Sequence, residues 1–414
     1  MTCAFSGNSS SENKTIDMKQ IITLVFALLC VHAISFANFS SADNRTEFTS
    51  NAPFPTLKQQ KIQVAILLDV SNSMDGLIDQ AKAQLWHMVN TLGKVRCGTK
   101  SNLGGIYSTP VIEIALYEYG RSDNPVANGY IRQLLPFTTD LDRISATLFG
   151  LSTNGGDEFC GQVMITSLQL LQWDPNPMSY KTIFIAGNED FLQGPVHFQK
   201  ACNLAKEKGV IINTLYCGSK ADGIREHWNI IDQCGGGSFT NINPNLKIDE
   251  TPTPYDDQII TLNSTLNNTY VAYGRRGMEA AAMQHDLDEK NRAMSKSVAV
   301  KRAKAKGNKM LYQNNAWDLV DRYEADSIGT LNLPNAELPD ALKGKSKKEI
   351  KKYIEEKQLE RARVREQIDA LSKKREQFLA DEKKKNGSAQ QPTLESEIEK
   401  SIHEQVIKVN MFVE

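Results

Sequence analysis

The chain has 414 residues, of which 40% are hydrophobic and 23% are charged, and its formal net charge is −1. This length allows two domains with a large core. The balanced charge gives no global signal for binding to nucleic acid, so we do not expect that class of partner.

The amino-terminal segment has the pattern of an export signal. Met18 and Lys19 open a short basic region, residues 21–34 are mostly apolar, and the small residues Ser35 and Ala37 precede a cleavage point. We predict an upstream extension and signal peptide at 1–37, with the signal itself at 18–37, and a flexible leader at 38–60. We therefore expect the protein to be exported to the periplasm, the cell surface or the medium. Retention of the apolar segment as an uncleaved membrane anchor is the alternative.

Export permits disulfides, and five cysteines follow the signal. Because this number is odd, at least one of them has no partner within the chain. The spacing matches no zinc motif and does not fix the pairing, and a role as small buried hydrophobic residues fits some of them as well as a bridge does. The five are Cys97, Cys160, Cys202, Cys217 and Cys234.

Between residues 61 and 245, apolar segments typical of strands alternate with amphipathic helices. This alternation predicts an α/β domain with a doubly wound, mostly parallel sheet. The segments at 111–118 and 130–136 are joined by a polar loop, which predicts a hairpin. The expected strands are 62–68, 111–118, 130–136, 181–186, 210–216 and 238–242, and the expected helices are 76–92, 140–149, 161–172, 197–208 and 222–233.

The remainder of the chain has a helical pattern. A proline-containing linker at 246–258 precedes a helical region at 259–340 and a long charged helix at 341–385, and a polar spacer and short amphipathic tail occupy 386–414. The charged helix fits a solvated helix or weak coiled coil with many i,i+4 pairs. A basic arm that associates with a membrane or envelope polymer is the alternative, and the amino-terminal segment offers the same association.

Oxygen-bearing side chains follow the first predicted strand. Asp69, Ser71 and Ser73 alternate directly after an apolar run, at the strand end where open α/β sheets bind their ligands. One carboxylate and two hydroxyls are hard ligands that suit Mg²⁺ or a similar cation. The alternative is local capping, in which Ser73 or Asp75 caps a helix that begins near Met74.

This segment resembles the start of the metal-ion-dependent adhesion site (MIDAS) of von Willebrand factor type A (VWA) domains, which reads Asp-x-Ser-x-Ser. The resemblance covers residues 61–245 and implies the VWA fold, with Asp69, Ser71 and Ser73 around the cation. Thr-Asn-Gly-Gly-Asp-Glu at 153–158 and Trp-Asp-Leu-Val-Asp at 317–321 are similar to exported bacterial VWA proteins with a helical carboxy-terminal extension. That likeness implies no particular activity.

Two further loops complete the site in the family, and here both depart from its pattern. The second loop contains Thr153, but its glycine pair places Asp157 or Glu158 near the threonine of the family. A carboxylate there holds the cation more tightly and leaves less positive charge for a partner. Turn formation by residues 154–157 is the competing explanation.

The third loop lacks the aspartate that the family usually has. It reads Ala-Gly-Asn at 186–188, so Asn188, Glu189 or Asp190 must substitute, or the site is degenerate and holds no metal.

The resemblance implies a binding module rather than an enzyme. The expected cation is Mg²⁺, or Mn²⁺ or Ca²⁺, and the expected ligand from outside is a carboxylate on a partner protein. A metal-free scaffold that interacts through its carboxy-terminal helices is the alternative. A metal-dependent hydrolase is less favoured, because the chain has neither a Gly-x-Ser-x-Gly elbow nor a phosphate-binding loop, and His87 and His227 fall in predicted helices.

Overall fold

The computed structural model describes residues 59–98, 107–234, 236–242, 251–385 and 393–414. The predicted signal peptide therefore lies outside the described residues, as do all but the last two residues of the predicted leader and residues 246–250 of the predicted linker. Within these ranges, no helix is both long enough and apolar enough to cross a membrane.

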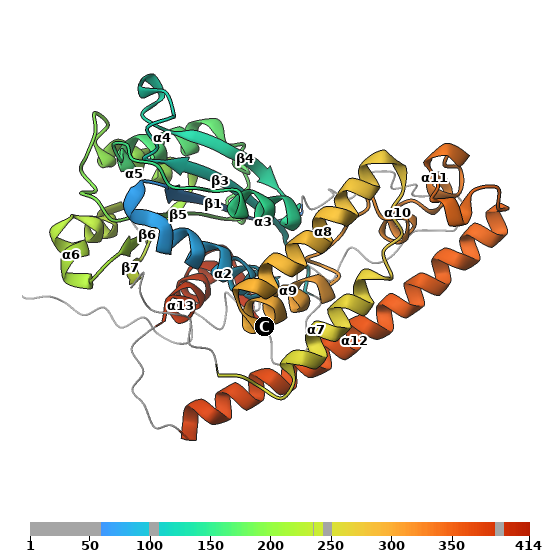
Figure 1. Cartoon of the computed structure of the whole chain (residues 1–414). Coiled ribbons are helices and arrows are strands. Elements are labelled where there is room, and N and C mark those ends of the chain that lie inside the picture. The colour runs from blue at the N-terminus through green and yellow to red at the C-terminus, as the bar shows by residue number, and fades with distance from the viewer. Residues whose placement is uncertain (1–58, 99–106, 235, 243–250, 386–392) are drawn as a thin grey trace, which may run out of the picture. The chain divides into compact units, whose positions relative to one another are not determined.

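A six-stranded sheet forms the centre of the amino-terminal half (Figure 1). Its spatial order is β4-β3-β1-β5-β6-β7, and every neighbouring pair is parallel except β3 and β4, which are antiparallel. The α/β fold and the predicted hairpin are thus confirmed. The strands are β1 (Lys61–Asp69), β3 (Val111–Tyr119), β4 (Arg132–Thr138), β5 (Tyr180–Gly187), β6 (Ile211–Cys217) and β7 (Phe239–Ile242).

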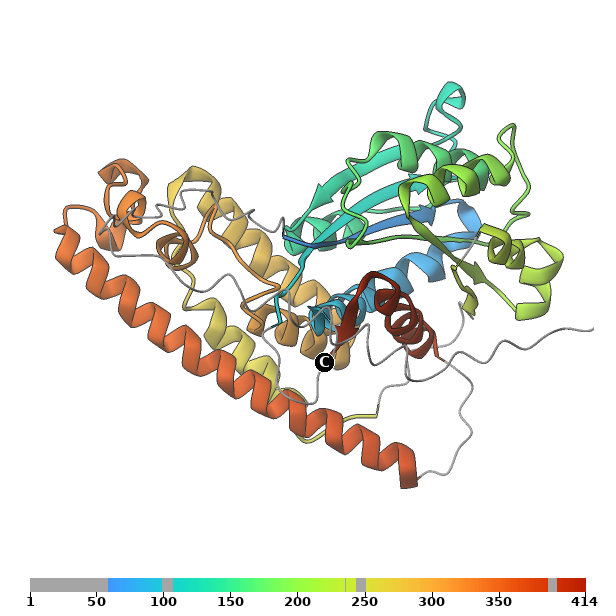
Figure 2. The same ribbon diagram turned by 180° about the vertical axis from the view of Figure 1, so that it is seen from behind.

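Helices cover both faces of this sheet, which is why its central strands are apolar throughout. Alternate residues of β1 point to opposite faces, so Val64 and Leu68 belong to one core and Ala65 and Leu67 to the other. The first core is closed by α2 (Asp75–Leu92), α3 (Leu141–Phe149) and α13 (Leu394–Val406). The second is closed by α4 (Cys160–Leu170) and α5 (Phe198–Lys208), as Figures 1 and 2 show from opposite sides.

One predicted helix is interrupted. The segment expected at 222–233 forms α6 (Lys220–Arg225) and a 3-10 helix, η3 (Trp228–Cys234). The break lies at His227, whose φ of 63° is incompatible with a continuous helix. The prediction that His227 is helical is therefore wrong.

The tertiary structure decides which of the five cysteines are paired. Cys202 on α5 and Cys234 at the end of η3 form a disulfide, while Cys97, Cys160 and Cys217 are free and buried. Burial raises the pKa of the Cys160 thiol far above its usual value, so this cysteine is unreactive.

The helical region has cores of its own. Its helices are α7 (Asp256–Asn267), α8 (Gly274–Met294), α9 (Lys296–Gly307), α10 (Leu319–Ala325), α11 (Ser327–Leu331) and α12 (Lys347–Lys385). One cluster joins Leu319 and Val320 to Ile350 and Ile354, and another joins Ile259 and Val300 to residues further along α12.

The long charged helix α12 carries the predicted i,i+4 ion pairs on its exposed side, but it is not fully solvated. It lies along α7 and α9 (Figures 1 and 2), and its apolar residues Val364 and Ile368 are buried there. Two of its arginines also face inward, Arg361 toward Asp318 and Asp321 and Arg375 toward Asp256. Part of the basic charge that suggested an external anion is therefore paired inside the protein.

The carboxy-terminal tail returns to the sheet domain. Helix α13 packs on α2 and beside β7, and β8 (Met411–Val413) pairs antiparallel with β2 (Val95–Cys97), which follows α2. The sequence predicted a short amphipathic tail here, whereas its helical form and its packing partner were not evident.

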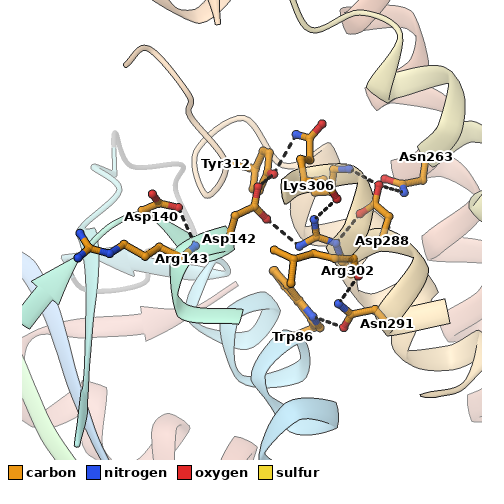
Figure 3. A network of polar contacts seen from close by, with 12 residues as sticks. Trp86, Asp140, Asp142, Arg143, Asn263, Asp288, Asn291, Arg302, Lys306 and Tyr312 are labelled. Atoms are coloured by element: carbon orange, nitrogen blue, oxygen red, sulfur yellow. Dashed lines mark hydrogen bonds and ion pairs between the residues drawn. The ribbon is translucent and has the colours of Figure 1, made fainter. Parts of the chain in front are cut away.

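A buried ion network fixes the helical region to the sheet domain (Figure 3). Arg302 on α9 is 1% exposed and donates to Asp142 on α3 at 2.8 Å, and also to Asp288 on α8. Tyr312 donates to the second oxygen of Asp142. The Arg302 guanidinium lies 4.8 Å from the ring of Trp86 on α2, so this one arginine contacts elements from both halves of the chain.

Asp288 makes the stability of this network depend on pH. Burial opposes its ionisation, but Lys306 and Arg302 outweigh that effect and hold the pKa of Asp288 well below its ordinary value of 3.8. A depressed folded-state pKa contributes stability that is present above the unfolded pKa and is lost in acid. As the pH is lowered past about 4, we expect the free energy of unfolding to decrease. The contribution of Asp288 to this decrease is at most about 1.4 kcal/mol per pH unit.

Urea denaturation of the wild type and of Asp288→Asn across acidic pH measures this effect. The variant should lose less stability per pH unit than the wild type. Asp286→Asn changes an exposed carboxylate on the same helix and should leave the acid slope as it is. Equal slopes for the wild type and Asp288→Asn would contradict the assignment.

Candidate metal centre

The predicted site lies where the strand order of the sheet reverses. β1 has β3 on one side and β5 on the other, and the carboxyl ends of all three strands meet at one edge. Open α/β sheets bind ligands in the crevice at such a switch point. Asp69 is the last residue of β1, Gly120 follows β3 and Gly187 ends β5.

Asp69 is fully buried at this edge. Its Oδ1 accepts from the backbone N–H of Ser71 at 2.8 Å, whereas its Oδ2 is buried with no hydrogen-bond partner in the described structure. Burial raises the pKa of Asp69 to about 6, although hydrogen bonds from Ser71 oppose the shift. An unpartnered carboxylate oxygen in a dry environment is costly, so it marks a place where a cation or a proton is needed.

A second carboxylate, Glu158, lies beside Asp69. It is 5% exposed, and its Oε2 is also buried without a partner in the described structure. Burial, followed by repulsion from Asp69, raises the pKa of Glu158 to about 9. The two carboxylates are thus held together at a free-energy cost that a shared cation or proton relieves.

Neutral oxygens complete the group. The Ser71 and Ser73 hydroxyls are 3.2 Å apart, and the Ser73 hydroxyl donates to the Asn188 amide oxygen at 3.1 Å. Helix α2 begins at Asp75 with Met74 as its N-cap, and no side chain caps it. The N-cap position thus belongs to Met74 rather than to Ser73, whose hydroxyl donates to Asn188 instead.

The strand order supplies the remaining evidence about the fold. When the six strands are numbered in chain order, their spatial order is 3-2-1-4-5-6 with strand 3 antiparallel, and Asp-x-Ser-x-Ser follows strand 1. The fold is that of a VWA domain.

Comparisons with solved structures found VWA domains. The VWA domain of SpRpn10 matches at 16% identity and a TM-score of 0.32, covering 45% of this chain and 91% of that one. A von Willebrand factor type A protein from Catenulispora acidiphila matches at 15% identity and a TM-score of 0.32, covering 45% of this chain and 39% of that one. Proximal thread matrix protein 1 from the mussel byssus, with a zinc-occupied MIDAS motif, matches at 13% identity and 0.31, with coverages of 44% and 42%.

The chain thus spans less than half of the length of the last two proteins. No protein-family model and no curated protein match the sequence. Because the TM-scores are low, the assignment of the fold rests on the strand order and the loop residues of this chain.

The second loop of the sheet domain, between α3 and α4, is fixed against the first. The Asn154 N–H donates to the Val70 carbonyl at 2.9 Å, and the Gly155 carbonyl accepts from the Ser122 N–H at 2.8 Å. Thr153 is half-buried on this loop and Asp157 is exposed. Glu158, rather than Asp157, is the carboxylate that the loop presents to Asp69.

The third loop contributes Asn188. Asp190, which the sequence left open as a substitute, instead lies 2.9 Å from Nδ1 of His227 and accepts from the Leu192 N–H. Glu189 is exposed, and repulsion by its negative charge helps to raise the pKa values of both Asp69 and Glu158.

Two glycines that sequence reasoning missed make room for the carboxylates. A Cβ on Gly120, whose φ is +76°, would lie 2.7 Å from Asp69 Oδ1 and 2.9 Å from Glu158 Cγ. A Cβ on Gly187 would lie 2.6 Å from the Tyr119 hydroxyl and 3.2 Å from Asp69 Oδ2. Their positions at the ends of β3 and β5 are the signal that was available.

The residues fit a hard divalent cation. Asp69 and Glu158 supply two carboxylates, and Ser71, Ser73 and Asn188 supply neutral oxygens, which is the donor chemistry that Mg²⁺, Mn²⁺ and Ca²⁺ prefer. In the described ranges, no three His, Cys, Asp or Glu side chains gather into a metal-binding group. The site therefore depends on hydroxyl and amide oxygens as well as on carboxylates.

Proposed function

We propose that the protein is an exported interaction module in which a divalent cation orders the loops at the carboxyl edge of a VWA domain. The observation that carries this proposal is the pair of buried, unpartnered oxygens, Asp69 Oδ2 and Glu158 Oε2, on two separate loops. A cation bound between them cancels their repulsion and joins the first loop to the second.

Export is supported by two observations. Residues 18–37 have the pattern of a signal peptide, and Cys202 and Cys234 form a disulfide, which persists in oxidising compartments. The periplasm, the cell surface and the medium all meet this condition.

The proposal concerns binding rather than catalysis. We assign the oxygens around Asp69 to cation binding, and the ring of His227 is engaged by Asp190. A partner carboxylate, which a site with neutral hydroxyls would attract, is disfavoured because Glu158 adds a second negative charge.

Metal binding is tested by thermal unfolding of the full chain after EDTA treatment and dialysis. With Mg²⁺ at about one hundred times its Kd, binding stabilises the folded state by about 2.7 kcal/mol, and we expect the Tm to rise by about 5 °C. Mn²⁺ and Ca²⁺ are compared in the same way. Asp69→Asn and Glu158→Gln should each abolish most of the shift, because each removes an anionic ligand.

Asp79→Asn is the matched control, since it removes an exposed carboxylate from α2. It should retain the wild-type shift. A Tm that no divalent cation changes, in a wild-type protein that is folded, would sink the metal proposal.

A scaffold without metal is the second candidate, and one observation favours it. Burial and repulsion from Asp69 raise the pKa of Glu158 to about 9, so a proton could neutralise the carboxylate pair in place of a cation. In that case Glu158→Gln is stabilised relative to the wild type with and without Mg²⁺, and the helical region provides the interaction surface.

A further inference from the structure

The loops around the candidate metal centre carry exposed negative charge. Asp157 and Glu189 are exposed, and neither carboxylate has a hydrogen-bond or ion-pair partner among the described residues. Each is the immediate neighbour of a proposed ligand, Asp157 of Glu158 and Glu189 of Asn188. A cation that binds Glu158 and Asn188 therefore also fixes the spacing between these two free carboxylates.

The charge balance of the centre decides which partner fits these loops. Asp69 and Glu158 together cancel the charge of a divalent cation, and Ser71, Ser73 and Asn188 are neutral. The loaded centre then has no net positive charge to attract an anion, while Asp157 and Glu189 remain uncompensated beside it. Positive groups nearby are already engaged, because Arg121 pairs with Asp123 at 2.9 Å and His227 contacts Asp190.

Apolar residues lie beside these carboxylates, on the loops after β3 and β5 and at the start of α4. The loop after β3 and the loop after β5 both rest on Phe159, which follows Glu158. The rings of Tyr130 and Phe159 are 5.7 Å apart, and a Cβ on Gly194 would lie 2.6 Å from Phe159 Cδ1. Val126 on the loop after β3 is 67% exposed, and Leu192 on the loop after β5 is 41% exposed.

On the basis of the proposed function, we infer that the VWA domain binds a basic protein segment, with lysine or arginine side chains set against Asp157 and Glu189. The buried, unpartnered oxygens of Asp69 and Glu158 point to the cation, and the two exposed carboxylates select the charge of the partner. A neutral oxygen of that partner, from a backbone carbonyl or a hydroxyl, completes the coordination of the cation. An acidic partner meets like charge on both loops.

The probes are two fluorescein-labelled peptides of equal length in a serine-glycine background, one rich in lysine and one rich in glutamate. Binding to the full chain is measured by fluorescence anisotropy in Mg²⁺, at low and at physiological salt. We expect the lysine-rich peptide to bind more tightly than the glutamate-rich one. Asp157→Asn and Glu189→Gln should each weaken its binding by about two- to fivefold at low salt, and less at higher salt.

Glu207→Gln is the matched control, because Glu207 is exposed on α5 at the end nearest the start of β6, away from the carboxyl edge. It should leave binding of the lysine-rich peptide unchanged. Preference for the glutamate-rich peptide, binding of neither peptide, or equal weakening by Glu207→Gln would overturn the inference.

The Mg²⁺ shift in Tm is recorded on the same samples, and Asp157→Asn and Glu189→Gln should keep it. A normal shift together with preference for the glutamate-rich peptide means that only the partner class is wrong. Loss of the shift in the wild-type protein means that the proposed function has failed, whichever peptide binds.

Discussion

Replacement of Arg302 by alanine is expected to lower the free energy of unfolding by about 3–5 kcal/mol. Arg302 is 1% exposed, and its guanidinium donates to Asp142 on α3, to Asp288 on α8 and to the Gln284 carbonyl at 3.2 Å. Its removal takes from Asp142 its cationic partner, leaves Asp288 with Lys306 alone, and opens a cavity beside Trp86. Both effects act at the contact between the sheet domain and the helical region, so the loss should be cooperative.

Urea denaturation followed by circular dichroism measures this loss. Lys296→Ala removes a cation from the same helix, but its ion pair with Asp257 is exposed, so it should change the stability by less than about 1 kcal/mol. A double variant, Arg302→Met with Asp142→Leu, removes the charges together and should recover part of the stability. If Arg302→Ala and Lys296→Ala have equal effects, the network does not hold the two regions together.

Gly161→Ala is the second substitution with a large expected effect. We expect it to destabilise the protein, although helix propensity alone predicts that it stabilises α4. Gly161 is the second residue of α4, where alanine should stabilise the helix by about 1 kcal/mol relative to glycine. A Cβ at this position would, however, lie 1.9 Å from the backbone oxygen of Val196. Because this neighbour is backbone, the segment around Val196 must move, and we expect a net loss of at least about 2 kcal/mol.

Gly150→Ala provides the comparison. Gly150 follows α3 with a φ of −82°, and a Cβ there would meet its nearest atoms at 3.5 Å, which is ordinary contact. It should be neutral in urea denaturation. The Mg²⁺ shift in Tm should also shrink for Gly161→Ala, because Val196 belongs to the loop that carries Asn188. A stabilised Gly161→Ala protein would show that this close approach of α4 to the loop is absent.

The centre of the site could be predicted because its signal is local. An apolar run of strand length that ends in Asp69, Ser71 and Ser73 fixes both the strand and the edge at which it terminates. The ligands from the other two loops were harder to assign, since glycine-rich turns and binding loops share one composition. Only the fold shows that Glu158 turns inward beside Asp69 while Asp157 faces solvent, and that Asn188 rather than Asp190 reaches Ser73.

The carboxy-terminal half shows the limit of pattern analysis more clearly. The high charge of α12 suggested a solvated helix, yet Arg361 is 1% exposed and bonded to Asp318 and Asp321. Composition cannot distinguish an arginine that faces water from one that pairs inside, because the partner is distant in sequence.

By itself, the sequence determined the alternation of strands and helices, the parallel sheet and the position of Asp69, because each follows from hydrophobic periodicity over a few residues. Only the tertiary structure decided the strand order, the Cys202–Cys234 bridge, the return of α13 to the sheet and the pairing of Asp69 with Glu158. These features join segments that are far apart in the chain. Their energies come from burial and charge pairing, which exist only once the whole core has formed.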